Sequence, residues 1–149
     1  MEDNYEVITN NHGIHYYKNK KRHRDNDLPA VEYNTGTRMW FINGKLHREG
    51  GPAIIYPGGV KEWWINGKKH REGDPAVEYP SGAEEWYING LRHREDGPAV
   101  TWSSDGTKEW WINNIDITEE VKEWITSNNI PDYKKWTNKE KSLFKLKFL

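Results

Sequence analysis

The sequence predicts a mainly β fold: an antiparallel β-meander of about 4.5 stacked hairpin repeats of 23 residues, with a C-terminal α-helical cap. Landmarks recur every 23 residues, short β-branched and aromatic runs alternate with glycine-containing turns, and the pattern becomes helical after residue 117. Because such units bury their apolar side only against neighbours, we expect one open, curved, MORN-like sheet. The recurring landmarks are Pro29, Pro52, Pro75 and Pro98, His47, His70 and His93, and Trp40, Trp63 and Trp86.

The copies start near residues 4, 29, 52, 75 and 98, so the sheet is expected to occupy residues 1–117. Each full copy, and the half copy that starts at Pro98, has a first short run, a turn with glycine, and a second, aromatic run. This run ends in Asn-Gly or, in the half copy, in Asn-Asn. Asn-Gly is a strong turn signal because both residues tolerate positive φ. Reading each copy as one hairpin gives a meander of about eight to ten strands. The first copy is degenerate, as suits a terminal repeat.

Residues 118–149 are expected to form the helical cap. Thr118 fits an N-cap before an amphipathic segment that ends near Pro131. Thr137 and Glu140 have the spacing of a capping box that opens a second helix. The apolar positions expected to pack are Val121, Trp124, Ile125, Leu143, Phe144 and Phe148.

Composition excludes several classes of protein. The 22 basic and 23 acidic residues give a net charge of −1, which argues against a general nucleic-acid binder. The absence of cysteine excludes disulfides and thiolate zinc sites. There is no apolar run long enough to span a membrane and no signal-peptide pattern, so we expect a cytoplasmic protein without membrane contact. Nine Trp and eight Tyr at periodic positions nevertheless supply a core.

The segment from Trp86 to Ala99 reads Trp-Tyr-Ile-Asn-Gly-x-x-His-Arg-Glu-Asp-Gly-Pro-Ala. It resembles the repeat of a family of proteins abundant in bacteriophages and giant viruses, distantly related to the MORN hairpin repeat. Residues 117–124 and 130–136 are similar to the tail that those proteins often carry. The resemblance covers nearly the whole chain and implies a hairpin-repeat sheet, a viral origin, and so a location in the host cytoplasm. The Tyr-x-Gly and His-Gly signatures of MORN repeats proper are absent here, and neither family implies catalytic residues.

The His-Arg-Glu connectors between copies, at residues 47–49, 70–72 and 93–95, are the most enzyme-like feature of the chain. Equivalent histidines should lie two strand spacings apart, on the order of 10 Å, whereas zinc needs its ligands at about 2.0–2.1 Å. One connector alone offers one histidine and one acid. We therefore expect an Arg–Glu ladder, with each histidine hydrogen-bonded to the adjacent turn. No catalytic residue, metal site or cofactor is predicted, and the chain is expected not to be an enzyme.

Side chains along the second run should alternate between two faces. The first face repeats Trp and Ile in the full copies and is expected to be core. The second varies among Phe, Trp and Tyr and carries acids, which indicates a surface for a partner or ligand. The candidate binding residues are Phe41, Trp64, Tyr87 and Trp111, the acids Glu62 and Glu85, and the connector arginines Arg48, Arg71 and Arg94.

Three functional hypotheses follow. The chain is expected to be a non-enzymatic interaction module that binds a host or viral protein through the second aromatic face. The alternative is a protein that sequesters a small nucleotide signal of antiviral defence, with rings stacking on the base and the connector arginines holding phosphate. A third hypothesis is self-association through the open N-terminal edge near residues 5–17, because an unpaired edge strand can pair with a second copy.

Overall fold

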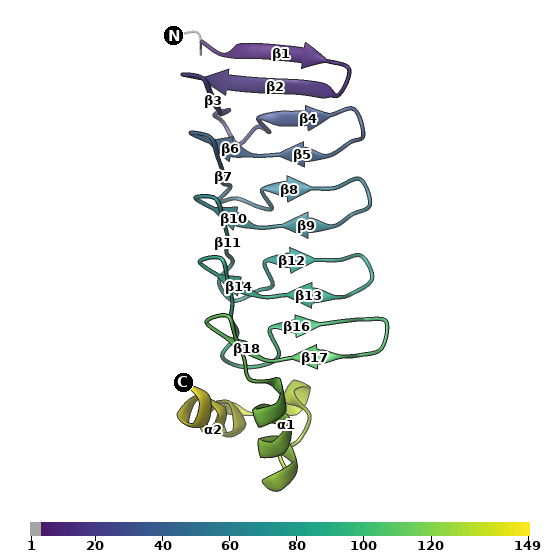
Figure 1. Ribbon diagram of the computed structural model, residues 1–149, viewed down its shortest axis with the longest axis vertical. Coiled ribbons are helices and arrows are strands. Elements are labelled where there is room, and N and C mark those ends of the chain that lie inside the picture. The colour runs from purple at the N-terminus through teal and green to yellow at the C-terminus, as the bar shows by residue number, and fades with distance from the viewer. Residues whose placement is uncertain (1–3) are drawn as a thin grey trace.

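A computed structural model describes residues 4–149, so only the first three residues of the expected repeat segment 1–117 lie outside it. It is a tall stack of hairpins closed at one end by helices (Figure 1). The main sheet has 11 strands, all paired antiparallel. Along the sheet these are β1 (Glu6–Asn10), β2 (Gly13–Lys18), β4 (Val31–Tyr33), β5 (Arg38–Met39), β8 (Ile54–Ile55), β9 (Lys61–Glu62), β12 (Val77–Glu78), β13 (Glu84–Glu85), β16 (Val100–Thr101) and β17 (Lys108–Glu109), with β3 (Lys21–Arg22) paired to β2.

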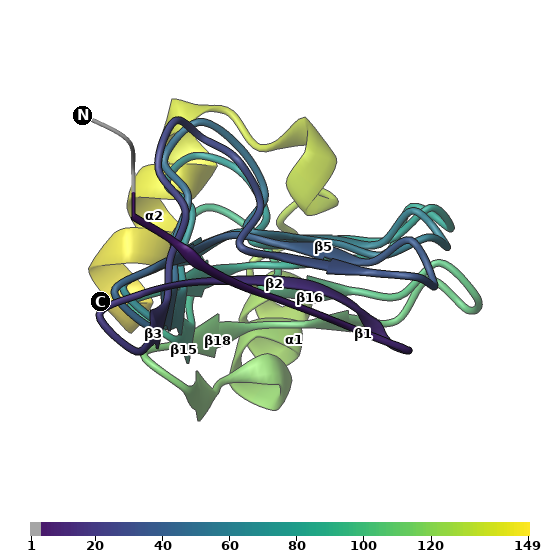
Figure 2. The same cartoon turned by 90° about the horizontal axis from the view of Figure 1, so that it is seen from above.

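The predicted antiparallel β-meander with C-terminal helices is confirmed, but each full copy contributes two hairpins instead of one. The second hairpins form a row along one side of the main sheet and turn out of its plane (Figures 1 and 2). We call them the arm hairpins. They are β6 (Phe41–Ile42) with β7 (Lys45–Leu46), β10 (Trp64–Ile65) with β11 (Lys68–Lys69), β14 (Tyr87–Ile88) with β15 (Leu91–Arg92), and β18 (Trp111–Ile112) with β19 (Ile115–Asp116).

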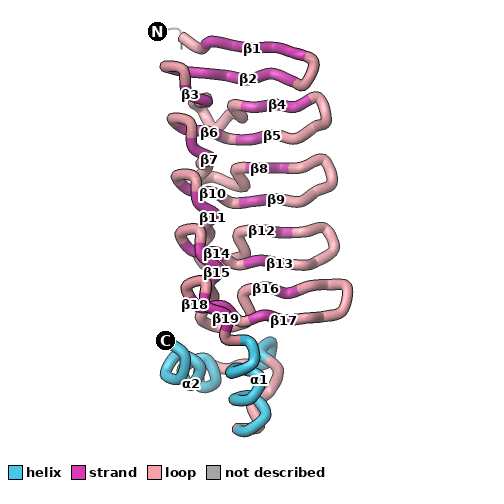
Figure 3. Tube along the Cα trace, in the orientation of Figure 1, coloured by secondary structure: helices cyan, strands magenta, loops and turns pink. Residues whose placement is uncertain are grey.

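The chain turns from the main sheet into the arm at the first tryptophan of each copy. The Trp63 N–H donates to the Ala76 carbonyl of the next copy at 2.8 Å, which continues the main sheet. The Trp63 carbonyl accepts from the His70 N–H at 3.1 Å, which closes the arm hairpin. One residue therefore serves both ladders, and the expected second strand is split there into two short ones (Figure 3).

The Asn-Gly turns form as expected. Asn66 has φ 51° and Gly67 has φ 79°, the pair of positive values that a type I′ hairpin turn requires. The N–H of Gly67 also donates to the Leu46 carbonyl of the preceding arm at 2.8 Å, and Gly90 bonds Lys69 in the same way. Successive arm hairpins are thus joined by backbone hydrogen bonds, although each of their strands is only two residues long.

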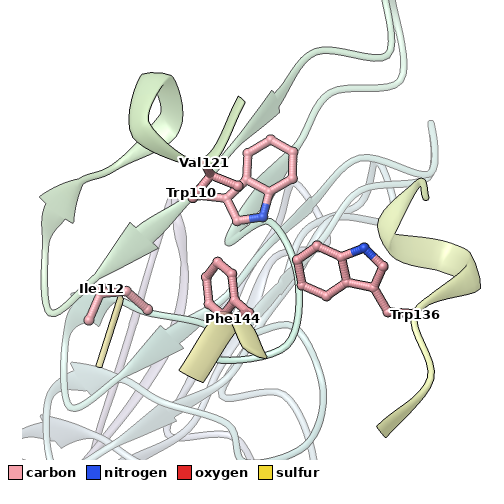
Figure 4. Packing of buried hydrophobic residues seen from close by; sticks show 5 residues of the cluster. All are labelled: Trp110, Ile112, Val121, Trp136 and Phe144. Carbon is pink, nitrogen blue, oxygen red and sulfur yellow. The ribbon is translucent and has the colours of Figure 1, made fainter. Parts of the chain in front are cut away.

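The cap consists of α1 (Thr118–Ser127), the 3₁₀ turn η1 (Tyr133–Lys135) and α2 (Asn138–Phe148). Figure 4 shows the cluster that fixes it beneath the last copy, in which Trp110 and Ile112 of the sheet side meet cap residues. The buried cap residues in this cluster are Val121, Trp136 and Phe144.

The sequence reading of the cap is confirmed at one helix start and wrong at the other. At α2, Thr137 and Glu140 make the expected capping box. Thr118 does not cap α1, because it lies inside the helix and its hydroxyl accepts the Trp110 N–H at 3.0 Å. Leu143 is 40% exposed and so does not belong to the buried stripe. None of the helices in residues 4–149 is both long and apolar enough to cross a membrane.

Candidate interaction surface

The connector histidines tie each copy to the next. The Nδ1 atom of His70 accepts the backbone N–H of Asn89 in the following Asn-Gly turn at 3.1 Å. Its Nε2 atom lies 3.9 Å from Glu72 of its own connector. The other members of the series are His23 with Asn43, His47 with Asn66, and His93 with Asn113, at 3.0–3.2 Å. The expected bond between histidine and adjacent turn is confirmed, and it requires an unprotonated Nδ1.

The connector arginines pack against the first tryptophan of their own copy. The Arg71 guanidinium lies 3.9 Å from the centre of the Trp63 ring, and its Nη1 donates to the Pro75 carbonyl at 3.1 Å. Arg48 and Arg94 repeat this arrangement on Trp40 and Trp86 at 4.0 and 3.8 Å.

The expected Arg–Glu ladder is found only in part: within residues 4–149, Arg71 pairs with a glutamate, whereas Arg48 and Arg94 pair with aspartates. Arg48 pairs with Asp27, Arg71 with Asp74 and Glu78, and Arg94 with Asp96. The connector acids Glu49 and Glu72 instead have side chains 87% exposed beside their histidines. The guanidinium lies away from these acids because it is held over the indole ring and bonds the proline carbonyl.

Between successive connectors lie three equivalent clefts. Their floors are Trp40 with Ile42, Trp63 with Ile65, and Trp86 with Ile88. Their volumes are about 440, 300 and 490 Å³, and the helix residue Lys145 joins the rim of the third. The face that carries the repeated Trp and Ile was expected to be core, but in these three copies it lines open clefts. It is fully covered at the last copy, where the cap buries Trp110 and Ile112.

The variable rings lie on the other side of the strand, beside a row of carboxylates. Trp64 Nε1 donates to Glu62 at 2.8 Å, and Trp111 Nε1 donates to Glu109 at 2.9 Å. The Glu85 carboxyl accepts from both Tyr79 and Tyr87 hydroxyls, at 2.7 and 2.8 Å. The expected side-by-side placement of acid and ring is thus confirmed for Trp64, Tyr87 and Trp111, whose rings are held by these hydrogen bonds.

Glu85 is a buried anion, with only 6% of its surface exposed. Burial raises the pKa of its carboxyl, but the hydrogen bonds from Tyr79, Tyr87 and Arg92 outweigh this and hold the pKa below its usual value. Burial and the hydrogen bond to Glu85 raise the pKa of the Tyr79 phenol. The cluster is therefore fixed with a charged acid and neutral tyrosines.

Cations that the sequence reading missed alternate with these rings. Lys69 Nζ lies 5.6 Å from the centre of the Trp64 ring and 5.3 Å from that of Tyr87. The Arg92 guanidinium lies 5.9 Å from Tyr87 and 5.3 Å from Trp111. We call this row the ring–cation stripe. It consists of Phe41, Trp64, Tyr87 and Trp111 with Arg22, Lys69 and Arg92.

A sequence signal for these cations exists. Trp64 faces Lys69 and Tyr87 faces Arg92 across the arm hairpins. In these hairpins, whose turns have two residues, the second residue before the turn is five positions ahead of its partner on the other strand. The residue five positions after each variable ring is therefore its cross-strand neighbour on the same face.

The structure divides the nine candidate residues between two sides. Phe41, Trp64, Tyr87 and Trp111 belong to the stripe, and Glu62 and Glu85 lie beside it. The rings are half-buried except Phe41, which is 8% exposed and also lines the first cleft. The nucleotide hypothesis combined these rings with the arginines Arg48, Arg71 and Arg94. In the structure those guanidinium groups lie against Trp40, Trp63 and Trp86 instead.

No group of three or more His, Cys, Asp or Glu side chains able to hold a metal ion occurs among the residues that the structure describes. Comparisons with protein-family models, with curated proteins and with solved structures find no match for the chain.

Proposed function

We propose that the protein is a non-enzymatic interaction module that binds a protein partner through the ring–cation stripe. The partner segment runs along the stack as an extended chain and places apolar side chains against the half-buried rings. The proposal rests mainly on the alternation of ring and cation, which is continuous from Trp64 to Trp111. Trp, Tyr and Arg are also the residue types that contribute most binding energy at protein interfaces.

The cations of the stripe keep hydrogen-bond donors that a partner can use. Arg92 uses Nε and Nη2 for Tyr87 and Glu85, which leaves Nη1 without a hydrogen bond among residues 4–149. Lys69 Nζ lies 3.5 Å from a carboxylate oxygen of Glu62. The cleft arginines, for comparison, each bond the carbonyl of a proline in the next copy, and they also pair with acids.

Regular spacing supports an extended partner. Equivalent rings of successive copies are separated by two strand spacings, roughly 10 Å. Three residues of an extended chain span about the same distance. A partner segment can therefore present one anchor to each copy without changing its conformation.

The decisive experiment is selection of a random peptide library displayed on phage against the immobilised protein. We expect enrichment of extended sequences with large apolar residues at a regular interval. The Lys69→Glu variant should lose these peptides, because the charge reversal falls between Trp64 and Tyr87. The matched control is Lys68→Glu, since Lys68 is the adjacent residue of β11, its side chain is exposed beside Gly90, and it points to the other side of the strand.

Both variants must show the circular dichroism spectrum of the unchanged protein. Peptides that bind Lys69→Glu as well as Lys68→Glu would place the interaction elsewhere and refute the proposed surface. A selection that enriches no peptide for the unchanged protein would refute the proposed function itself.

A further inference from the structure

The N-terminal strand β1 differs from the inner strands of the main sheet. It is five residues long, whereas the strands of the three full copies have two or three. All five residues are exposed, with Val7 at 51% and Ile8 at 41%. Within residues 4–149 it pairs on one side only, with β2. It contains none of the lysine, proline or bulge features that usually protect an edge.

The hydrogen bonds of β2 show which backbone groups of β1 point outward. The Tyr16 N–H donates to the Ala30 carbonyl on the β4 side, so its neighbour His15 directs its backbone groups toward β1. His15 is paired with Ile8. The backbone groups of Ile8 are therefore used within the sheet, and those of Val7 and Thr9 face away from it.

At the opposite end of the main sheet, the helical cap takes the place of a further strand. In the inner copies the tryptophan N–H bonds the alanine carbonyl of the next copy, as Trp86 does with Ala99 at 2.7 Å. At the last copy the Thr118 hydroxyl takes the Trp110 N–H instead, and α1 lies below β17 (Figure 1). A head-to-tail contact between β1 and the β17 end of another molecule is thus blocked. Of the two ends of the main sheet in residues 4–149, this leaves β1, and pairing of β1 with β1 gives a closed two-fold contact.

We propose that two copies of the chain associate through antiparallel pairing of their β1 strands about Ile8, which joins their main sheets into one. Ile8 is the middle residue of β1, so this register uses the whole strand. It places Val7 opposite Thr9 of the second copy, and each such pair exchanges backbone hydrogen bonds through its outward groups. Glu6 lies opposite Asn10 of the second copy, so no like charges meet.

The first test is sedimentation velocity over a range of concentrations with a proline variant. Thr9→Pro removes an outward N–H and leaves the hydrogen bonds between β1 and β2 in place, and proline is tolerated on such edges. We expect the unchanged protein and Thr9→Ala to form dimers as concentration rises, and Thr9→Pro to remain monomeric with an unchanged thermal midpoint. A monomer for the unchanged protein up to about 1 mM would overturn the proposal.

The second test uses the absence of natural cysteine. In the proposed register the two Ile8 residues form a non-hydrogen-bonded pair with Cα atoms about 4.5 Å apart, within the range for a disulfide. The two Val7 residues lie roughly 8 Å apart, beyond it. Under mild oxidation Ile8→Cys should crosslink much faster than Val7→Cys. Equal rates would reject this register, as would crosslinking of Ile8→Cys that Thr9→Pro does not slow.

Discussion

Phe144 is the side chain on which the cap depends most. It is fully buried, and its ring centre lies 5.4 Å from that of Trp136, 6.1 Å from that of Trp124 and 4.9 Å from that of Phe148. Replacing it with alanine removes the ring from the middle of the cluster that joins α2 to the last copy. The neighbouring aromatic side chains are too large to collapse into the space without moving their own backbones.

The size of the effect follows from the burial. A buried aromatic side chain withdraws about 150–250 Å² from water, which corresponds to about 4–6 kcal/mol at about 25 cal/mol per Å². Alanine retains part of this, and Phe→Ala changes in cores typically cost about 3–5 kcal/mol. We expect the free energy of unfolding of Phe144→Ala to fall by about 4 kcal/mol. Helix α2 should unfold before the sheet, because an isolated helix of 11 residues is marginally stable in water.

Urea unfolding followed by tryptophan fluorescence and by circular dichroism measures this loss, since Trp124 and Trp136 lie against Phe144. Leu146→Ala is the matched control, because Leu146 is on the same helix and 85% exposed. It should change the unfolding free energy by less than about 0.5 kcal/mol. Equal effects of the two variants, or a loss below about 1 kcal/mol for Phe144→Ala, would refute the assignment of Phe144 as the centre of the cap.

Three further predictions concern the repeats. Asn66 has φ 51°, so Asn66→Ala should lower the unfolding free energy by roughly 1–2 kcal/mol while Asn66→Gly costs less, and equal urea midpoints would contradict the turn assignment. Hydrogen bonds, first that from Lys18, hold the pKa of Asp25 below its usual value. Asp25 should therefore stabilise the fold above about pH 4 and lose this contribution as pH falls further, and stability measured against pH should lose part of that dependence in Asp25→Asn. Arg71→Lys, which gives up planar stacking on an indole, should cost about 1 kcal/mol in thermal unfolding, whereas Arg38→Lys at an exposed position should be neutral.

The period of the fold was predictable because the sequence repeats residues whose backbone roles are specific. Asn66 and Gly67 can both adopt positive φ, so their place in a tight turn follows from composition alone. The bend at Trp63 was not predictable. A strand has the same alternation of side chains whether it stays in one sheet or leaves it. The bend depends instead on the backbone hydrogen bond from Trp63 to Ala76 of the next copy, which a side-chain pattern does not show.

The candidate surface was predictable in part for the same reason. Alternation correctly placed Trp64 and Glu62 on one side of the strand. It could not show that Arg71 would stack on Trp63 and so lie away from the variable rings. The choice of partner for a long flexible arginine depends on tertiary packing, which a single sequence leaves open. Lys69 was missed because its role depends on the register of the arm hairpin.

The bond between each histidine and the next Asn-Gly turn has a consequence for how such a molecule evolves. Every hydrogen bond of this series joins equivalent positions of adjacent copies, as His47 does with Asn66 and His70 with Asn89. Excision of residues 52–74 would join Gly51 to Pro75 and bring His47 to Asn89, with each donor and acceptor matched again. Duplication of the same segment would lengthen the stack by roughly 10 Å. Gene rearrangement can thus change the length of the ring–cation stripe in whole copies, whereas an insertion of any other length breaks the register of the histidine–asparagine hydrogen bonds.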